Sequence, residues 1–332
     1  MITAFIYPFL LSLSVLLITI HLSHKHNLFI DDADHDKPQN YHLTSTPRVG
    51  GIGIIIGMFF LISLPLGFEL LIPLSLALFS GIFEDLHNSL SPRLRLFLQV
   101  LAALSAIWFT DAVITYLGLG VSMPYWMGVF FSVFAIVGMM NAINIIDGFN
   151  GLASGIILLI LLSFSITSYT HDNTTMLYIS LTSLGTIVAF LLLNFPKGKI
   201  FLGDGGAYLL GFIVAIIGIF LVSRYETVSP WYILALFIYP VWEVFFSIIR
   251  KLSIGLSPMQ PDTKHLHMLV YRQVTHNNPL TALFMVLSTL PFMTLSTIFP
   301  NKSTTNIAIA GCFILCYLIL YVYLDKKDRK TI

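Results

Sequence analysis

The sequence predicts an all-α integral membrane protein, a polytopic helical bundle with about eleven transmembrane helices. Of its 332 residues, 57% are apolar and only 10% are charged, whereas a soluble domain carries about 25% charged residues. The apolar residues form repeated runs of roughly 18–22, the length that a membrane-spanning helix requires. These runs do not alternate between apolar and polar residues, which excludes the outer-membrane β-barrel class.

Each apolar run is expected to form one spanning helix, and residues 1–332 to form a single membrane-embedded domain. The first run lacks a basic n-region and a small-residue cleavage motif, so we interpret it as a retained helix and not as a signal peptide. The predicted spans are 2–22, 49–66, 68–84, 94–112, 125–145, 150–169, 176–194, 206–223, 230–249, 279–298 and 305–324.

The basic residues divide unequally between the two sets of connections. Of the 17 lysines and arginines, only Arg224 and Lys302 lie in one set. The other fifteen, with Arg95 just inside a span end, belong to 23–48, 85–93, 146–149, 195–205, 250–278 and the C-terminal tail. Because cytoplasmic loops are enriched in Lys and Arg, this division predicts an external N-terminus and a cytoplasmic C-terminus.

Five polar segments gather on the predicted cytoplasmic face. They are "TPRVGGIG" (46–53), "GIFEDLHNSLSPRLR" (81–95), "NAINIIDGFNGL" (141–152), "FPKGKIFLGDGGAYLLGF" (195–212) and "PDTKHLHMLVYR" (261–272). Polar groups near hydrocarbon are costly unless they face partners, water or a ligand. Their concentration on one face therefore predicts a single site where the membrane meets the cytoplasm. A secondary transporter would instead place such groups near the middle of the bilayer.

The acidic and amide side chains of these segments are suited to a hard cation. Asn141, Asn144 and Asp147 are three residues apart, so on a helix they lie near one another. Their oxygens and those of Asp204 suit Mg²⁺, with Mn²⁺ as the alternative. The chain offers no basic stripe with interleaved aromatic residues, so nucleic acid is not an expected partner.

A phosphate-binding region is predicted beside these ligands. Asp204 lies between Gly203 and Gly205 at a helix start, where backbone N–H groups and the helix dipole favour a phosphate. Four basic residues can add positive charge: Arg48, Lys197, Lys199 and Lys264. Together, these groups indicate phosphoryl transfer between a soluble nucleotide and a lipid phosphate.

Each feature taken alone also has a structural interpretation. Asp147 followed by glycine is typical of a helix end and turn. The pair Glu84 and Asp85 fits a solvated helix end, and the histidines of 261–272 fit an ordinary loop. Glu243 lies inside a predicted span, where an acid serves either function or hydrogen bonding between helices.

In this order, the five segments resemble the motifs of the polyprenyl-phosphate N-acetylhexosamine-1-phosphate transferase family. That family includes undecaprenyl-phosphate GlcNAc-1-phosphate transferases and phospho-MurNAc-pentapeptide translocases. "TPRVGG" looks like its PTPRxGG motif, with His42 at the usual distance upstream. "NAINIIDGFNGL" is similar to NxxNxxDGxDGL, "FLGDGGAYLLGF" to FxGDxGSxxLGF and "PDTKHLHMLVYR" to PDxxHxHHLL. The stretch "YPVWEVFFSIIRK" looks most like the O-antigen-initiating branch.

The resemblance implies a role for each matching residue. Asp204 matches the magnesium-binding aspartate, and Asn144 and Asp147 match residues of the metal and nucleotide-sugar site. Glu84 and Asp85 match the acidic pair on the lipid-phosphate side. Histidines near the pyrophosphate correspond to His265 and His267, and the substrate-binding set comprises Asn144, Asn150, Arg48, His42, Lys197, Lys199, Gly203, Gly205 and Lys264.

Four positions depart from the family pattern. Glu84 replaces the first aspartate of the acidic pair, and Asn150 stands where a second aspartate is common. Gln39 replaces an arginine, and Met268 replaces a third histidine. These departures leave open a catalytically inactive member that acts as an assembly partner.

The function predicted from the sequence is therefore transfer of a sugar 1-phosphate from a UDP-sugar to undecaprenyl phosphate, with release of UMP. Implied partners are the UDP-sugar, undecaprenyl phosphate, membrane lipids and, as a candidate, a second copy of the chain. The implied location is the bacterial inner membrane, with the active site on the cytoplasmic face, in the initiating step of a cell-surface polysaccharide. The alternatives are a phospho-MurNAc-pentapeptide translocase and a non-enzymatic transporter or assembly partner.

Overall fold

Helices make up nearly all of the regular structure of the protein, which is described here from a computed structural model. The structure describes residues 1–31, 46–87, 91–224, 228–258, 260 and 262–331. The first eight helices are α1 (Ile2–His26), α2 (Gly50–Met58), α3 (Gly67–His87), α4 (Pro92–Thr110), α5 (Tyr125–Ile146), α6 (Leu152–Thr170), α7 (Thr174–Asn194) and α8 (Gly203–Arg224). They are followed by α9 (Pro230–Leu236), α10 (Ile238–Ser253), α11 (Leu266–Val270), α12 (Asn278–Ile298) and α13 (Ser303–Thr331).

Short elements complete the structure. A 3₁₀ helix, η1 (Phe59–Ser63), continues α2, and a π-helical turn, η2 (Tyr271–Thr275), continues α11. Strand β1 (Ile30–Asp31) pairs antiparallel with β2 (Thr46–Pro47), and β3 (Tyr116–Gly118) pairs antiparallel with β4 (Val121–Ser122). The predicted all-α polytopic class is confirmed.

Nine helices within the described ranges are long and apolar enough to cross a membrane: α1, α3, α4, α5, α6, α7, α8, α12 and α13. The outward surface fits this interpretation, since Trp108 and Phe130 are 84% and 76% exposed. Such large apolar side chains are stable at the surface when hydrocarbon surrounds them.

The two remaining predicted spans have a different form from a continuous helix. Over 230–249, α9 and α10 are separate helices bent by 76°, so they count as one further span only as a pair. The break lies where Pro240 would clash with the carbonyl of Leu236, four residues earlier. Over 49–66, the apolar helix is shorter, Gly50–Ser63, because Leu64 precedes a proline and is extended.

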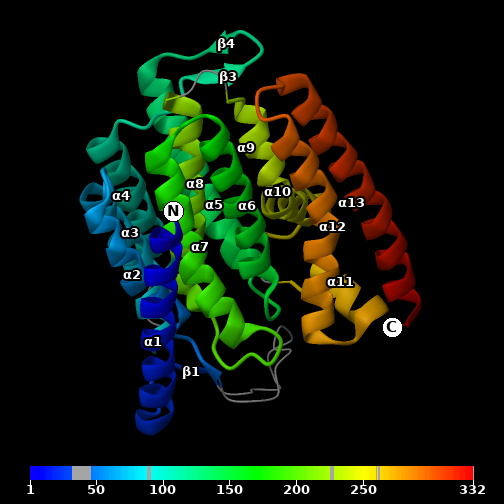
Figure 1. Ribbon diagram of the computed structural model, residues 1–332. Helices are drawn as coiled ribbons and strands as arrows, with labels where there is room; N and C mark the ends of the chain where they lie inside the picture. The colour runs from blue at the N-terminus through cyan, green and yellow to red at the C-terminus, as the bar shows by residue number, and fades with distance from the viewer. Residues whose placement is uncertain (32–45, 88–90, 225–227, 259, 261, 332) are drawn as a thin grey trace.

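Helix α8 lies at the centre of the bundle and is almost entirely buried. It packs against α2, α3, α5, α6 and α7 (Figure 1). Glycines permit the closest of these approaches. A Cβ atom added at Gly51 would lie 2.7 Å from the Gly206 backbone nitrogen, and one at Gly211 would lie 2.6 Å from the Met140 Cα. The start of α8 is thereby surrounded by the ends of its neighbours.

The predicted cytoplasmic segments meet at one end of the bundle. Figure 1 shows β1 and α11 at the lower end and the β3–β4 hairpin at the upper end. The loop before α8 joins β2 at the lower end, because the Phe201 N–H donates to the Pro47 carbonyl and the Gly50 N–H donates to the Phe201 carbonyl. The α5–α6 turn approaches α11, since a Cβ atom added at Gly148 would lie 3.7 Å from His267 Nε2.

Candidate active site

The N-terminus of α8 holds the carboxylate of Asp85, which comes from the end of α3. The backbone N–H groups of Asp204 and Gly205 donate to its two oxygens at 2.9 and 3.0 Å. Gly203 has a φ of +73°, and a Cβ atom there would lie 2.7 Å from Asp85 Oδ2. The sequence predicted that these N–H groups face a phosphate. In the structure they donate to Asp85, whose carboxylate caps the helix because a negative charge suits the positive end of a helix dipole.

Asp204 joins three helices at this point. Its Oδ2 accepts a hydrogen bond from Arg95 of α4 at 3.1 Å, and its Oδ1 accepts one from Asn144 of α5 at 3.0 Å. The Arg95 and Asp204 side chains are each about a quarter exposed, so this pair is open to solvent. The predicted association of Asn144 with Asp204 is therefore present in the geometry.

Asp147 adds a third carboxylate at the end of α5. It is the C-cap of α5, as the glycine that follows it indicated. Loss of solvation raises the pKa of Asp147 to about 7, and the charges of Asp204 and Asp85 add to this effect. The positive charge of Arg48, which follows β2, acts in the opposite direction. Asp147 thus lies within reach of the charges of Asp204, Asp85 and Arg48.

The residues at this end fit a hard cation that brings its own water. No group of three or more His, Cys, Asp or Glu side chains forms a ready-made metal cage among the described residues. Mg²⁺ needs no such cage, because it commonly binds one or two carboxylates and completes its shell with water and phosphate oxygens. Asp204 and Asp147, with the Asn144 amide, offer hard oxygens of this kind, and a cation would also relieve the repulsion among the three carboxylates.

Other predicted residues lie around this cluster in different ways. Glu84 is partly buried next to Asp85. The exposed side chains of Lys197 and Lys199 pair with none of the three aspartates within the part of the chain that the structure describes. The predicted contact of His42 lies outside the described residues.

The two other asparagines of the α5–α6 segment have structural partners. Asn141 Nδ2 donates to Gln99 Oε1 of α4 at 2.8 Å, one turn deeper than Asn144. Asn150 Nδ2 donates to the Pro196 carbonyl at 3.2 Å, and the Asn150 N–H donates to Asn278 at 2.8 Å. In the structure Asn150 ties the α5–α6 turn to the α7–α8 loop and to α12, and its role in substrate binding stays a prediction.

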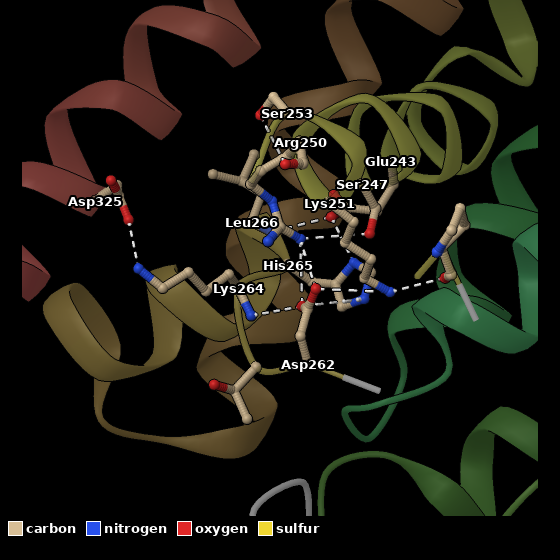
Figure 2. Close-up of polar contacts among 12 residues, drawn as sticks. Glu243, Ser247, Arg250, Lys251, Ser253, Asp262, Lys264, His265, Leu266 and Asp325 are labelled. Atoms are coloured by element: carbon tan, nitrogen blue, oxygen red, sulfur yellow. Dashed lines mark hydrogen bonds and ion pairs between the residues drawn. The ribbon is translucent and has the colours of Figure 1, made fainter. Parts of the chain in front are cut away.

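The histidine segment lies between α10 and the α5–α6 turn. His265 contacts Glu243 of α10, as Figure 2 shows, and its ring stacks on His267 with centroids 5.5 Å apart. His267 is fully buried, and burial lowers the pKa of its ring to about 4. The Nζ atom of Lys264 donates to Asp325 of α13 at 3.0 Å, and the contact of Lys264 with a phosphate stays a prediction. The side chains of His265 and His267 are therefore directed toward α10, and that of Lys264 is directed toward α13.

Comparison with known proteins is consistent with this arrangement. The model of glycosyl transferase family 4 matches residues 68–222, which contain the three aspartates and Asn144. An undecaprenyl-phosphate alpha-N-acetylglucosaminyl 1-phosphate transferase of Thermotoga maritima is 30% identical over 261 residues, which cover 74% of each chain. The chain belongs to glycosyl transferase family 4.

Two further relatives carry related names. A probable undecaprenyl-phosphate N-acetylglucosaminyl 1-phosphate transferase of Bacillus subtilis is 27% identical over 79% of this chain and 76% of its own. A phospho-N-acetylmuramoyl-pentapeptide-transferase of Streptococcus pneumoniae is 27% identical over 65% of this chain and 72% of its own. The resemblance seen in the motifs is confirmed at the level of the family.

Two residues of this candidate site were not among the predicted site residues. Arg95 pairs directly with Asp204, although in the sequence it was only placed near a span end and within a family motif, with no role at the site. Its place in "SPRLR", one turn after a helix N-cap at Ser91, was an available signal. Glu243 contacts His265. Its position inside an apolar helix indicated either a functional role or hydrogen bonding between helices, and the sequence did not decide between them.

Proposed function

We propose that the protein transfers N-acetylhexosamine 1-phosphate from a UDP-sugar to undecaprenyl phosphate and releases UMP. The observation that carries the proposal is the convergence of Asp85, Asp147 and Asp204, with Arg48 and Arg95, at the start of α8. The carboxylates of such a site suit a divalent cation, and its arginines suit the pyrophosphate that the cation accompanies. The names of the two N-acetylglucosaminyl 1-phosphate transferases support the same reaction.

In the proposed reaction, an oxygen of the lipid phosphate attacks the β-phosphorus of the UDP-sugar, and the bond to the UMP oxygen breaks. A phosphate monoester is already largely ionised at pH 7, so the attack requires no base. Both oxygens of Asp85 accept hydrogen bonds from α8, which supports an orienting role for this residue.

The other charged residues hold the donor. Asp204 and Asp147, with Asn144, would hold Mg²⁺ or Mn²⁺, which when bound supplies positive charge to the pyrophosphate. Arg48 and Arg95 supply fixed positive charge next to it. Because these groups are in place before the reaction, they stabilise the charge that develops on the leaving UMP without reorganisation.

We further propose that this end of the bundle faces the cytoplasm of a bacterial inner membrane. The excess of Lys and Arg in the segments at this end supports the orientation, and the soluble UDP-sugar is a cytoplasmic metabolite in such a reaction. Reporter fusions after Lys327 and after Asp172 should lie on opposite sides of the membrane. Reporters on the same side would contradict the proposed orientation.

The reaction can be tested with purified protein, undecaprenyl phosphate, Mg²⁺ and a panel of radiolabelled UDP-N-acetylhexosamines. We expect UMP and a lipid-linked sugar phosphate in equal amounts from at least one donor. Asp204→Asn should abolish both products, whereas Asp172→Asn should not, because Asp172 is an exposed aspartate in the α6–α7 connection, outside the cluster. Normal turnover by Asp204→Asn would refute the assignment of the site.

The same panel separates the competing functions. UDP-MurNAc-pentapeptide belongs in it, because the Streptococcus pneumoniae relative is named for that pentapeptide transfer. If the protein used this donor alone, the proposed function would be wrong and the protein would be a phospho-MurNAc-pentapeptide translocase. A protein that binds undecaprenyl phosphate but uses no donor would instead indicate the assembly-partner role. Turnover of a UDP-N-acetylhexosamine would fit the initiation of a cell-surface polysaccharide such as O-antigen.

A further inference from the structure

One buried carboxylate collects hydrogen bonds from two different parts of the chain. Glu243 of α10 is 1% exposed. Its Oε1 accepts from His265 Nδ1 at 2.9 Å and from the Leu266 N–H at 3.1 Å, and its Oε2 accepts from the Tyr317 hydroxyl of α13 at 3.0 Å. Figure 2 shows Glu243 directed from α10 toward His265 and Leu266. The start of α11 is therefore attached to this single side chain.

A second residue on the same face of α10 holds the other histidine. The Tyr239 hydroxyl lies 3.1 Å from His267 Nδ1. Tyr239 and Glu243 are four residues apart, so they are neighbours on one side of the helix. The 76° bend between α9 and α10 comes just before them and sets the direction of this face. Helix α10 thus presents a tyrosine and a glutamate to a stacked pair of histidines.

The histidine pair in turn reaches the Asp147 turn. The two rings are nearly parallel, with an interplanar angle of 3°. His267 Nε2 is buried and has no hydrogen-bond partner among the residues that the structure describes. A Cβ atom added at Gly148, the residue after Asp147, would lie 3.7 Å from this nitrogen, and the rings of His267 and Phe149 pack edge to face with centroids 5.8 Å apart. The position of the histidines relative to the aspartate cluster therefore depends on their contacts with Glu243 and Tyr239 of α10.

We propose that Glu243 is a positioning residue that fixes the orientation and tautomer of His265 and, through the stack, the place of His267 beside the Asp147 turn. An ionised carboxylate only accepts hydrogen bonds, so His265 Nδ1 must carry a proton. The other ring nitrogen of His265, Nε2, lies 3.9 Å from Asp262 Oδ1. The role deepens the proposed transferase function and rests on it for its catalytic consequence.

A purely structural role does not account for a carboxylate at this position. A charge within an apolar helix is costly, and a well-packed apolar residue would join α10 to α13 as well or better. The join to the 262–264 segment is also made independently, because Arg250 donates to both oxygens of Asp262 at 3.2 and 2.9 Å. What Glu243 adds is a specific acceptor for the ring of His265.

The first test observes the ring directly and needs no activity. In protein with ¹⁵N-labelled histidine, with His265→Asn used for assignment, the spectrum should show a protonated Nδ1 on His265. Glu243→Gln, which keeps the size of the side chain, should shift these signals, because an amide does not enforce one tautomer. Tyr317→Phe removes another hydrogen bond from the same carboxylate and should leave them unchanged. An unprotonated Nδ1, or signals that Glu243→Gln leaves unchanged, would overturn the proposal.

The second test measures the catalytic consequence in a double-mutant cycle. Glu243→Gln should lower kcat/KM roughly tenfold, the effect expected when the partner that orients a functional histidine is removed. In the His265→Asn background it should have little further effect, whereas Tyr317→Phe should be near normal in both backgrounds. Additive losses, or equal losses from Tyr317→Phe, would assign Glu243 to packing. If no donor were used even by the unaltered protein, the proposed function would fail, while the ¹⁵N spectrum would still decide the role of Glu243.

Discussion

The close packing of α3 on α8 should control catalysis through a single glycine. Gly81 is buried on α3, and a Cβ atom added to it would overlap the Asp204 carbonyl carbon and lie 2.6 Å from the Gly205 Cα. Ordinary van der Waals contact begins at 3.4 Å, so Gly81→Ala must separate the helices by roughly 0.8 Å or more, since backbone atoms on both sides cannot move aside.

This displacement acts on Asp85, which lies one turn after Gly81 on the same side of α3. Its hydrogen bonds to α8, at 2.9 and 3.0 Å, would stretch beyond the usual range. A misplacement of about 1 Å costs about 10²-fold in rate, or about 2.7 kcal/mol of barrier. Gly81→Ala should therefore reduce turnover by about that factor.

The assay is UMP release per folded molecule, measured beside the melting temperature in detergent. Gly138→Ala is the matched control, because Gly138 lies in the middle of α5 and a Cβ atom added there meets nothing within 4 Å. It should keep normal turnover. If Gly81→Ala turned over within about twofold of the unaltered protein, Asp85 would not depend on the α3–α8 contact, and the reasoning would be wrong.

Four further outcomes are expected. Asp204→Asn should lower turnover by at least about 10²-fold, or about 3 kcal/mol of barrier, with little change in melting temperature, because it keeps the size of the side chain and removes the charge that holds the cation. Asp147→Asn and Asn144→Ala should lower turnover per folded molecule far more than Asn150→Ala; parallel losses of turnover and melting temperature would favour a packing role instead. Exhaustive chelation with EDTA should stop turnover, and added Mg²⁺ or Mn²⁺ should restore it, so full activity after chelation would remove the metal from the mechanism. Burial lowers the pKa of His267 to about 4 in the folded protein. Between about pH 6.5 and about pH 4, the unfolded chain therefore binds a proton at this ring and the folded protein does not. The free energy of unfolding should then fall by up to about 3 kcal/mol as pH drops from about 6.5 to about 4, and thermal melts of His267→Asn should lack this part of the pH dependence.

The spanning helices could be predicted from local composition because hydrocarbon acts on each segment separately. An apolar run of sufficient length forms a helix in a membrane regardless of which neighbours it later meets. The exceptions have local causes that are also visible in the sequence, namely Pro65 after the shortened second span and Pro240 at the bend between α9 and α10. Motif spacing likewise predicted that Asn144 and Asp147 belong together, since Asn144 lies on the last turn of α5 and Asp147 is its C-cap.

Contacts between distant segments could not be read in this way. The pairing of Asp204 with Asn144 and Arg95 joins three helices, and the capping of α8 by Asp85 depends on how closely α3 approaches. That approach is set by glycines on both helices, which the sequence shows only as small residues.

The directions in which neighbouring side chains point were the other property that only the tertiary structure decided. Lys264 and His265 are adjacent, yet one side chain pairs with Asp325 of α13 and the other with Glu243 of α10. The amino-acid sequence by itself determined the membrane class and the set of polar segments, because these follow from composition and from local spacing, and its motifs carried the resemblance to the family. Which polar side chain meets which was decided by helix packing, since a hydrogen bond requires its two atoms within about 3 Å, and only the assembled bundle sets that distance.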